Sequence, residues 1–511
     1  MKTITLFTPE RKRNSNRSLH IPGLLILIIL LISSAQKLNG KNQSSLDSGA
    51  DTLYSVKQLN EDFTVLLEAL EEGHPGLYRY APAKIFDKLF AKTKQSLDKP
   101  MSEIDFFLKL DTLIAGIHCG HTRIGLSSTL NSHINNSRIT IPFSFKFINN
   151  KTYLLNNYSE KKDLITGGEV ISINGNSIGS IIRKMLPLIS SDASILTYKY
   201  RYLEKANNFS RLYALLYGID TSFTIIYSSP VNSKPDTLKV KGISKTTMLK
   251  IAETRYPGQY AESLPVSLTY KNDTAILTVR TFNSSIYAES KVDYENFLKE
   301  AFNEFREKNI KNLIVDLRNN DGGDDIYGKI LASYFFDKPF YYYNSLEFKD
   351  TSYNFLKYTN ISNEDWTAQT KTSRKNSNNL YDYTDHPNLG KQENLSPGFQ
   401  GKVYILINGN SFSTTGEVVS VLHYNKKAEF MGEECGAAYY GSNSGFIAVL
   451  TLPNTKMRIS IPLLKYTMAV DNYDKNHGVI PDIPFSPDIK EIVEGKDPEM
   501  EYLLNLINNM K

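Results

Sequence analysis

The sequence has few cysteines and a single tryptophan. Two cysteines in 511 residues exclude a scaffold held by several disulfides and any metal module built on four cysteines. Hydrophobic residues make up 41% of the chain and charged residues 22%, and tyrosine and phenylalanine are abundant. This composition excludes a disordered or collagen-like protein, and the length fits roughly two to four domains.

A clustered basic face is also absent. The net charge of +5 arises largely in the first 35 residues, which hold five basic residues and one acidic residue, and the rest of the chain is close to neutral. Because proteins that bind polyanions usually carry clustered basic residues, we expect no nucleic-acid partner.

No hydrophobic run is long enough for a comfortable membrane span, which needs about 20 residues. The apolar run at 21–32 (IPGLLILIILLI) follows a basic segment and precedes the small residues Ser33-Ser34-Ala35. This order is typical of a secretory signal peptide. We therefore expect residues 1–35 to be removed and the mature protein, without a membrane span, to be periplasmic or extracellular. The alternative is an N-terminal membrane anchor.

The hydrophobic periodicity divides the remaining chain. Within residues 36–130, apolar residues such as Leu59, Phe63 and Leu66 recur at intervals of three and four, which predicts a helical region. Residues 131–245 contain short β-like segments, a tight Asn-Gly turn at 174–175 and a short helical segment. This combination predicts a PDZ-like, β-rich domain.

Strands and helices alternate across residues 246–490, which is the pattern of an α/β domain. Two predicted strands, 312–317 and 403–407, each run through a polar loop into a predicted helix. The intervening residues 337–400 are polar, and we expect them to be a functional loop rather than scaffold. Residues 491–511 are expected to form a C-terminal helix. The predicted fold class is thus multidomain α/β, with two strand-loop-helix corners.

The first corner reads DLRNNDGG, from Asp316 to Gly323. Two glycines allow the backbone to turn, and free N–H groups at the start of the next helix can hold an oxyanion or a phosphate. No Gly-Lys-Ser/Thr follows, so a P-loop is not supported. The alternative is a simple turn.

The second corner follows the strand 403–407 and contains Ser411 and Ser413. A serine at a helix N-terminus has an exposed hydroxyl, and the next N–H can stabilise a developing negative charge. The arrangement is like that of a nucleophile elbow, although the GxSxG letters are missing. An ordinary N-cap is the alternative.

A nucleophilic serine needs a base, and histidine is the candidate. His423 lies on the same predicted helix as the serines, too far along it to reach them. His121 lies in a glycine-containing loop just past a helix end. His118 and His121 could be metal ligands, but no third ligand and no HExxH pattern supports this. We expect neither a metal nor another cofactor.

Four motifs together resemble the C-terminal-processing (tail-specific) serine peptidase family. They are Gly120-His121-Thr122, the DLRNNDGG corner, Ser413 with Glu417 downstream, and the GVIPD segment at 478–482. One branch of that family pairs the serine with a lysine, whose expected position here is Ala438. The chain is therefore more similar to the tricorn-core branch, in which histidine is the base.

The resemblance implies roles for individual residues. It makes Ser413 the nucleophile and His121 the base, and it places the oxyanion hole at the N–H groups of Gly323 and Thr414. The extra residue before Glu417 leaves Ser411 as a competitor. The branch has a glutamate three residues before the Gly-Val pair, where this chain has lysine, so the neighbouring Asp474 is the expected orienting acid.

The family geometry would also bring Cys119 and Cys435 near the active site. In an exported protein a disulfide between them is plausible, and two unpaired buried thiols are the alternative.

The function implied is that of an exported serine endopeptidase that cleaves peptides or protein C-terminal regions, with a peptide or protein substrate as its partner. A PDZ-like domain would capture a chain terminus by strand addition. Two alternatives remain: a binding protein on the same scaffold, as retinoid-binding proteins of the eye have, or an esterase that uses the same serine and histidine.

Overall fold

The computed structural model describes residues 52–137, 139–205, 207–218, 220–232, 234–260, 264–395 and 398–509. The expected signal peptide at 1–35 lies outside the described residues. Within the described ranges, no helix has both the length and the apolar character needed to cross a membrane.

The N-terminal region is helical, as its periodicity predicts. Its helices are α1 (Val56–Gly73), α2 (Ala83–Gln95) and α3 (Glu103–Ala115), with a short β1–β2 pair (Leu53–Tyr54 and Met101–Ser102) at their ends. Ser55 and Gln58 form a capping box that starts α1, and the Ser102 hydroxyl caps α3. The periodic residues Leu59, Phe63 and Leu66 are fully or almost fully buried.

This helical region is joined to the C-terminal half of the chain. The loop after α3 leads through His121 into β3 (Arg123–Gly125), which pairs antiparallel with β21 (Arg458–Met468). Ile124 lies opposite Ile459 in this pairing. Strand pairing therefore fixes the position of the histidine loop relative to residues more than 300 positions later.

The middle region contains an antiparallel sheet in the order β4-β5-β6-β8-β9, with β7 paired to β6. Asn174 and Gly175 form the predicted turn with positive φ, and α5 follows it. The region thus has the predicted β-rich character, while its PDZ-like identity stays a prediction. Its elements are β4 (Phe143–Ile148), β5 (Lys151–Asn157), β6 (Glu169–Ile173), β7 (Asn176–Ser177), β8 (Ser222–Ser228), β9 (Pro235–Lys241), α4 (Ser128–Asn136), α5 (Ile178–Met185), η2 (Leu186–Leu188), α6 (Leu196–Glu204), α7 (Asn208–Tyr217), α8 (Lys245–Arg255) and α9 (Pro257–Tyr260).

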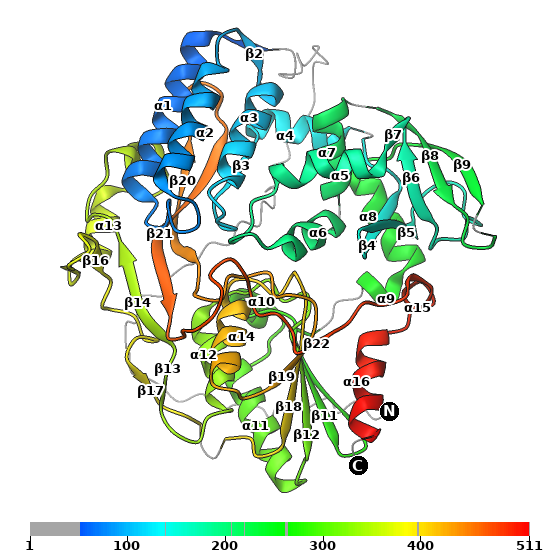
Figure 1. The fold of residues 1–511 in the computed structure, drawn as a ribbon, viewed down its shortest axis with the longest axis vertical. Helices are drawn as coiled ribbons and strands as arrows, with labels where there is room; N and C mark the ends of the chain where they lie inside the picture. The colour runs from blue at the N-terminus through cyan, green and yellow to red at the C-terminus, as the bar shows by residue number, and fades with distance from the viewer. Residues whose placement is uncertain are drawn as a thin grey trace, which may run out of the picture.

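The predicted α/β region forms a six-stranded sheet in the order β10-β11-β12-β18-β19-β22. All neighbours pair in parallel except β10 with β11. Figure 1 shows α11, α12 and α14 on one side of this sheet and α16 on the other. The elements are β10 (Val266–Lys271), β11 (Thr274–Val279), β12 (Asn312–Asp316), β18 (Lys402–Ile407), β19 (Glu429–Gly432), β22 (Ile483–Pro484), α10 (Ser284–Glu289), α11 (Tyr294–Glu307), α12 (Asp325–Ser333), α14 (Thr414–Tyr424), α15 (Ile489–Val493) and α16 (Pro498–Asn509).

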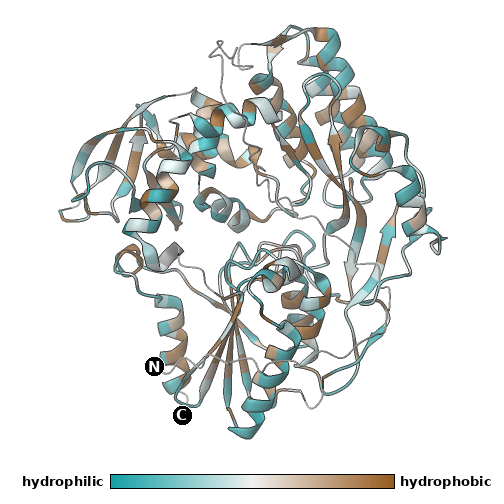
Figure 2. Cartoon of the chain, turned by 180° about the vertical axis from the view of Figure 1, so that it is seen from behind, coloured by the Kyte–Doolittle hydropathy of each residue, from teal (hydrophilic) through white to brown (hydrophobic). Residues whose placement is uncertain are grey.

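The expected C-terminal helix is α16, and it packs on the sheet. Leu503, Leu504 and Ile507 are buried in one cluster with Ile314 of β12 and Tyr404 of β18. Burial of apolar surface on both faces explains why these parallel strands read as continuous hydrophobic runs. Figure 2 shows hydrophobic residues along the strands of the structure.

Residues 337–400 are scaffold rather than a free loop, so that expectation is wrong. The segment contains β14 (Tyr343–Phe348), which pairs with β21 in a second sheet of order β15-β16-β14-β21-β20. Buried aromatic residues, among them Phe348 and Trp366, supply a core despite the polar composition. The remaining elements are β13 (Phe340–Tyr341), η3 (Asn354–Tyr358), α13 (Asn363–Thr370), β15 (Arg374–Lys375), β16 (Tyr381–Asp382), β17 (Lys391–Gln392) and β20 (Asn443–Thr451).

Candidate active site

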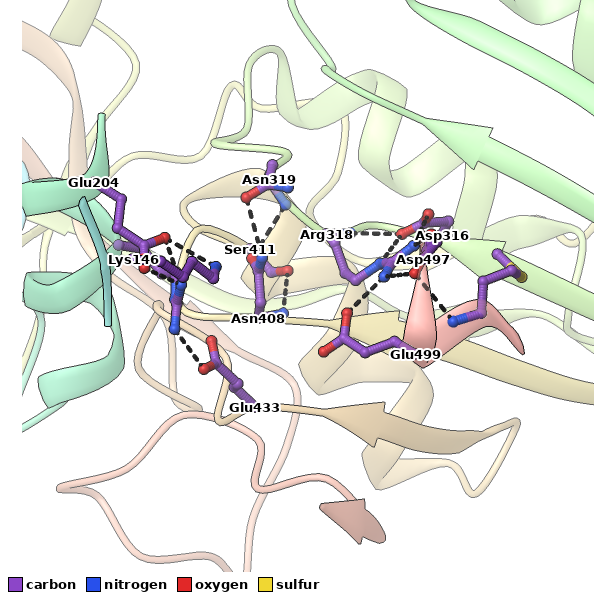
Figure 3. A network of polar contacts seen from close by, with 12 residues as sticks. Lys146, Glu204, Asp316, Arg318, Asn319, Asn408, Ser411, Glu433, Asp497 and Glu499 are labelled. Atoms are coloured by element: carbon purple, nitrogen blue, oxygen red, sulfur yellow. Dashed lines mark hydrogen bonds and ion pairs between the residues drawn. The ribbon is translucent and has the colours of Figure 1, made fainter. Parts of the chain in front are cut away.

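The two strand-loop-helix corners lie side by side. β12 and β18 are parallel neighbours, with Asp316 opposite Leu406, so the loops that follow them leave the same edge of the sheet. Hydrogen bonds join the loops: the Phe412 N–H donates to the Asn320 carbonyl at 3.1 Å, and the Asn319 N–H donates to Asn408 Oδ1 at 3.1 Å. The corners therefore form one rigid unit, part of which is seen in Figure 3.

Ser411 is fully buried and its hydroxyl is fully engaged. Ser411 Oγ donates to the Leu317 carbonyl at 2.9 Å and accepts from the Asn408 N–H at 3.0 Å. Its carbonyl accepts from the Gly436 N–H. Ser411 therefore links the two corners by hydrogen bonds (Figure 3). Because its hydroxyl is buried, a substrate cannot reach it.

Ser413 has a different environment. It immediately precedes α14 with φ 56° and ψ −128°, and its side chain makes no capping hydrogen bond, so the N-cap alternative does not hold. A positive φ in a residue other than glycine costs on the order of 1–3 kcal/mol and is concentrated at functional sites. The strained turn presents the hydroxyl at the positive end of the helix, as the elbow interpretation predicts.

The structure brings His121 to this hydroxyl. His121 Nε2 lies 3.1 Å from Ser413 Oγ, although the residues are 292 positions apart. The imidazole stacks on the Phe412 ring, with centroids 4.8 Å apart and planes at 27°. A Cβ at Gly120 would meet the Phe412 ring at 2.6 Å, so only glycine permits this close approach.

The charge state of His121 suits a proton acceptor. Burial, and secondarily the positive charge of Arg123, lower its pKa to about 3. The imidazole is therefore neutral at pH 7, and one ring nitrogen carries a lone pair. A tautomer with the proton on Nδ1 leaves Nε2 free to accept from Ser413.

The expected oxyanion donors are the N–H groups of Thr414 and Gly323. Thr414 is the first residue of α14, so its N–H has no acceptor within the helix. Gly323 lies opposite Phe282 in a parallel bridge, in which Phe282 bonds the Gly322 carbonyl and the Asp324 N–H. In such a bridge the N–H of the central residue, Gly323, points away from the partner strand. Thr414 Oγ1 donates to the Gly323 carbonyl at 2.7 Å, which joins the two donors.

The glycines of the first corner are required by contact. A Cβ at Gly322 would lie 2.7 Å from Ser413 Cβ and 3.0 Å from the Thr414 nitrogen, and the residue has φ +99°. Glycine at this position therefore lets the first corner lie directly against the serine and the following N–H group. The arrangement has the residue types that an acyl-transfer site requires: a serine hydroxyl, an imidazole within hydrogen-bond reach of it, and backbone N–H groups nearby.

Sequence comparison places these corners in a known family. The model of peptidase family S41 matches residues 273–485, which include DLRNNDGG, Ser413 and GVIPD but not His121. Residues 273–485 thus match the S41 peptidase family, and the chain is a serine-type peptidase. No curated protein matched the chain in sequence.

Similarity of fold to solved structures extends over most of the chain. Mature CPAF complexed with lactacystin superposes with a TM-score of 0.61 at 14% identity, covering 88% of this chain and 97% of that one. Mature CPAF alone gives a TM-score of 0.57 at 15% identity, with 89% and 98% covered. At such low identity this likeness concerns the fold.

One residue expected at the S41 site lies elsewhere. Asp474 is exposed, and its carboxylate accepts hydrogen bonds from the Asn476 backbone and side-chain amides at 2.8 and 3.0 Å. The structure records no contact between Asp474 and His121. In the structure the Asp474 carboxylate thus closes its own turn, and its role as the orienting acid stays a prediction.

The expected Cys119–Cys435 disulfide is also not formed. Both cysteines are buried free thiols. Cys119 Sγ donates to the Asn443 carbonyl at 3.6 Å, whereas Cys435 Sγ donates to the Ser411 carbonyl at 2.9 Å. Each thiol therefore has its own acceptor, and the alternative of two buried thiols describes the structure.

The sequence motifs did not single out Asp192. Its Oδ1 accepts a hydrogen bond from the Gly120 N–H at 2.7 Å, directly beside His121. A ring nitrogen of His121, the Cys119 sulfur and an Asp192 carboxylate oxygen lie within 4.8 Å of one another. Asp192 comes from the β-rich region, and no local pattern in the sequence links it to the histidine loop.

Proposed function

We propose that this S41 peptidase is an exported endopeptidase that cleaves peptides or protein C-terminal regions, with Ser413 as nucleophile and His121 as general base. The observation that carries this proposal is the 3.1 Å contact between His121 Nε2 and Ser413 Oγ. Hydrogen-bond reach between nucleophile and base is the geometric requirement for such a pair.

The proposed reaction uses this chain's own groups. Ser413 Oγ attacks the peptide carbonyl carbon while its proton moves to His121 Nε2. The N–H groups of Gly323 and Thr414 stabilise the oxyanion of the tetrahedral intermediate. The imidazolium then gives its proton to the leaving amine as the C–N bond breaks. A water molecule, deprotonated by the same imidazole, hydrolyses the acyl-enzyme.

Substrate capture is proposed to involve the β-rich region. Its sheet ends in the edge strand β9, whose outer side pairs with no other strand in the described residues, whereas Phe147 of the other edge strand, β4, is already bonded to Glu204 and Arg201 of α6. An extended peptide or a chain terminus can pair with such an edge. A peptide that carries a free C-terminus should therefore be cleaved faster than the same peptide as a C-terminal amide.

The decisive experiment compares two neighbouring serines. Ser413→Ala should abolish hydrolysis of a casein or peptide substrate and labelling by a fluorophosphonate probe, with an unchanged far-UV circular dichroism spectrum. Ser411→Ala should keep the labelled serine but lower the unfolding temperature, because it removes the buried bond between the corners. Full activity of Ser413→Ala would refute the assignment.

The two alternatives are tested with the same protein. A binding protein on this scaffold would leave the probe unreacted. An esterase would hydrolyse simple esters while leaving the peptides intact. Hydrolysis of peptides by wild type, lost in both Ser413→Ala and His121→Gln, supports the endopeptidase.

A further inference from the structure

Two buried polar atoms beside the nucleophile have no partner. His121 Nδ1 and Asp192 Oδ2 each make no hydrogen bond within the described ranges, although both are shielded from solvent. Asp192 as a whole is 1% exposed. A buried polar group without a partner costs free energy, so such an atom next to a reacting group requires an explanation.

The chain holds these residues close together. The Gly120 N–H donates to Asp192 Oδ1 at 2.7 Å. The Ala193 N–H donates to the His118 carbonyl at 3.1 Å, and His118 Nδ1 lies 2.8 Å from the Ala193 carbonyl. The segment that carries Asp192 is therefore bound to the histidine loop at His118 and at Gly120, the residue before His121.

Backbone strain is stored at the same place. Ala193 has φ 48° and His118 has φ 58°, both in the left-handed region that residues with a Cβ seldom adopt. Conformations of this kind persist only where the surroundings enforce them, and they are concentrated at functional sites. Here they set the Asp192 carboxylate against the loop that ends in His121.

The carboxylate can carry a charge at neutral pH. Burial raises the pKa of Asp192 to about 6, while the Gly120 N–H and the positive charge of Arg79 oppose that rise. Above that pH the group is an anion next to a neutral imidazole. An anion there stabilises the positive charge that develops on the ring during proton transfer.

We propose that Asp192 positions His121 by accepting a hydrogen bond from its Nδ1–H during the reaction. This inference rests on the proposed function. One ring nitrogen of His121 and one carboxylate oxygen of Asp192 lie within 4.8 Å, so the two side chains are close enough for a shift of about 2 Å to bring such a pair to hydrogen-bond distance. Catalytic hydrogen bonds commonly tighten in this way when substrate binds. Nδ1 then holds the proton, and Nε2 faces Ser413 as the acceptor.

The same cluster is a poor metal site. The Cys119 thiol donates to the Asn443 carbonyl, and burial raises its pKa, so the thiolate that a metal requires is disfavoured. His121 Nε2 is already engaged with Ser413. The orphan atoms are explained better by a hydrogen bond that forms between them.

The test is Asp192→Asn, which keeps an acceptor for the Gly120 N–H but removes the charge. We expect kcat to fall by about 10²–10⁴-fold with KM changed by less than about threefold. Asp192→Glu should recover part of kcat because it restores the anion. A kcat of Asp192→Asn within about threefold of wild type overturns the inference.

A matched control separates positioning from folding. Asp62 is another fully buried aspartate, and it accepts hydrogen bonds from Asn454 and Thr455 far along the chain. Asp62→Asn should lower the unfolding temperature yet keep kcat per folded molecule. If Asp192→Asn behaves like this control, its role is structural and the inference is wrong.

A measurement on the unmutated site decides the matter if Asp192→Asn does not fold. In the fluorophosphonate adduct of wild type, a far-downfield proton resonance of an imidazolium bound to a carboxylate is expected, and it should be lost in His121→Gln. Its absence from the adduct overturns the role of Asp192. If instead Ser413→Ala retains full activity, the proposed function itself fails, which is a distinguishable result.

Discussion

Tyr343 of β14 donates a hydrogen bond to Glu417 of α14 at 2.7 Å inside the protein core. Tyr342 donates to the same carboxyl oxygen at 3.4 Å, and both tyrosines are fully or almost fully buried. The residues that were expected to form a loop thus bind the helix that begins just after Ser413. The buried Glu417 thus fixes the first turn of α14 to β14 through these hydrogen bonds.

This acid should make stability depend on pH. Burial, and secondarily the charge of Asp325, raise the pKa of Glu417 to about 8. The folded protein therefore binds a proton that the unfolded chain has lost above about pH 4.5. The free energy of unfolding should fall as pH rises from about 5 to 8, by on the order of a few kcal/mol.

Glu417→Gln should remove that part of the pH dependence. Denaturant unfolding at pH 5, 6.5 and 8 gives the free energy of unfolding of the variant and of wild type. The difference between their pH dependences is the contribution of Glu417. An equal slope in both proteins would mean that Glu417 is ionised in the folded state.

Gly322→Ala should inactivate the enzyme without unfolding it. The new Cβ would lie 2.7 Å from Ser413 Cβ at a position with φ +99°, so either the serine or the first corner must move. We expect kcat to fall by about 10²-fold or more, since small displacements at a reacting centre are costly. Peptide hydrolysis at saturating substrate measures this.

Gly175→Ala is the matched control for Gly322→Ala. Gly175 also has a positive φ, +77°, but a Cβ there would meet no atom within 4 Å. It should cost about 1 kcal/mol of stability from backbone strain and leave kcat unchanged. A similar loss of kcat in both variants would contradict the steric explanation.

The two cysteines should behave as buried thiols. Thiol labelling of the unreduced protein should find none reactive in the native state and two after denaturation, because both are buried and free. A reductant should not change the unfolding temperature. Absence of reactive thiols in denatured, unreduced protein would instead reveal a disulfide.

Arg318 should hold the C-terminal helix in place. Its guanidinium donates to Asp316, Asp497 and Glu499, which joins the first corner to the start of α16 (Figure 3). Arg318→Met should destabilise the protein by about 1–3 kcal/mol, because it leaves the partly buried Asp316 and Glu499 and the half-exposed Asp497 without their cation. Hydrogen exchange should show that the backbone amides of α16 lose protection before those of the rest of the protein.

Lys308→Met is a control for Arg318→Met, since Lys308 pairs with Glu304 on an exposed helix surface. The cost there should be below about 1 kcal/mol. Equal protection of α16 in wild type and Arg318→Met would show that the apolar face of the helix suffices.

We predict that the protein is exported and that its mature form begins near residue 36. The small residues Ser33-Ser34-Ala35 are the expected cleavage site. N-terminal sequencing of protein recovered from outside the cytoplasm identifies the first residue of the mature chain. If the protein keeps the apolar run at 21–32 and is found in the membrane fraction, the alternative of an N-terminal membrane anchor is favoured.

Local signals predicted most of the secondary structure around the site. The strand at 274–279 is β11, and the helix at 414–424 is α14, because buried parallel strands read as apolar runs and polar turns bound them. Ser413 and His121 were assigned from the family resemblance of their motifs, and the structure places their side chains 3.1 Å apart.

The parts that could not be predicted depend on contacts between distant segments. Residues 337–400 are scaffold because their aromatic residues pack on β21, which no local pattern shows. Asp192 meets the histidine loop only through tertiary packing. Asp474 was chosen by its distance from the GVIPD segment, and its own turn uses its carboxylate.

The pairing of β3 with β21 has a consequence for when cleavage can start. Residues 123–125 are made early, yet their partners at 458–460 leave the ribosome near the end of synthesis. Until β21 has been made, the His121 loop cannot pair with it, so His121 is not held next to Ser413. On the proposed mechanism, a chain that lacks β21 should therefore have no peptidase activity.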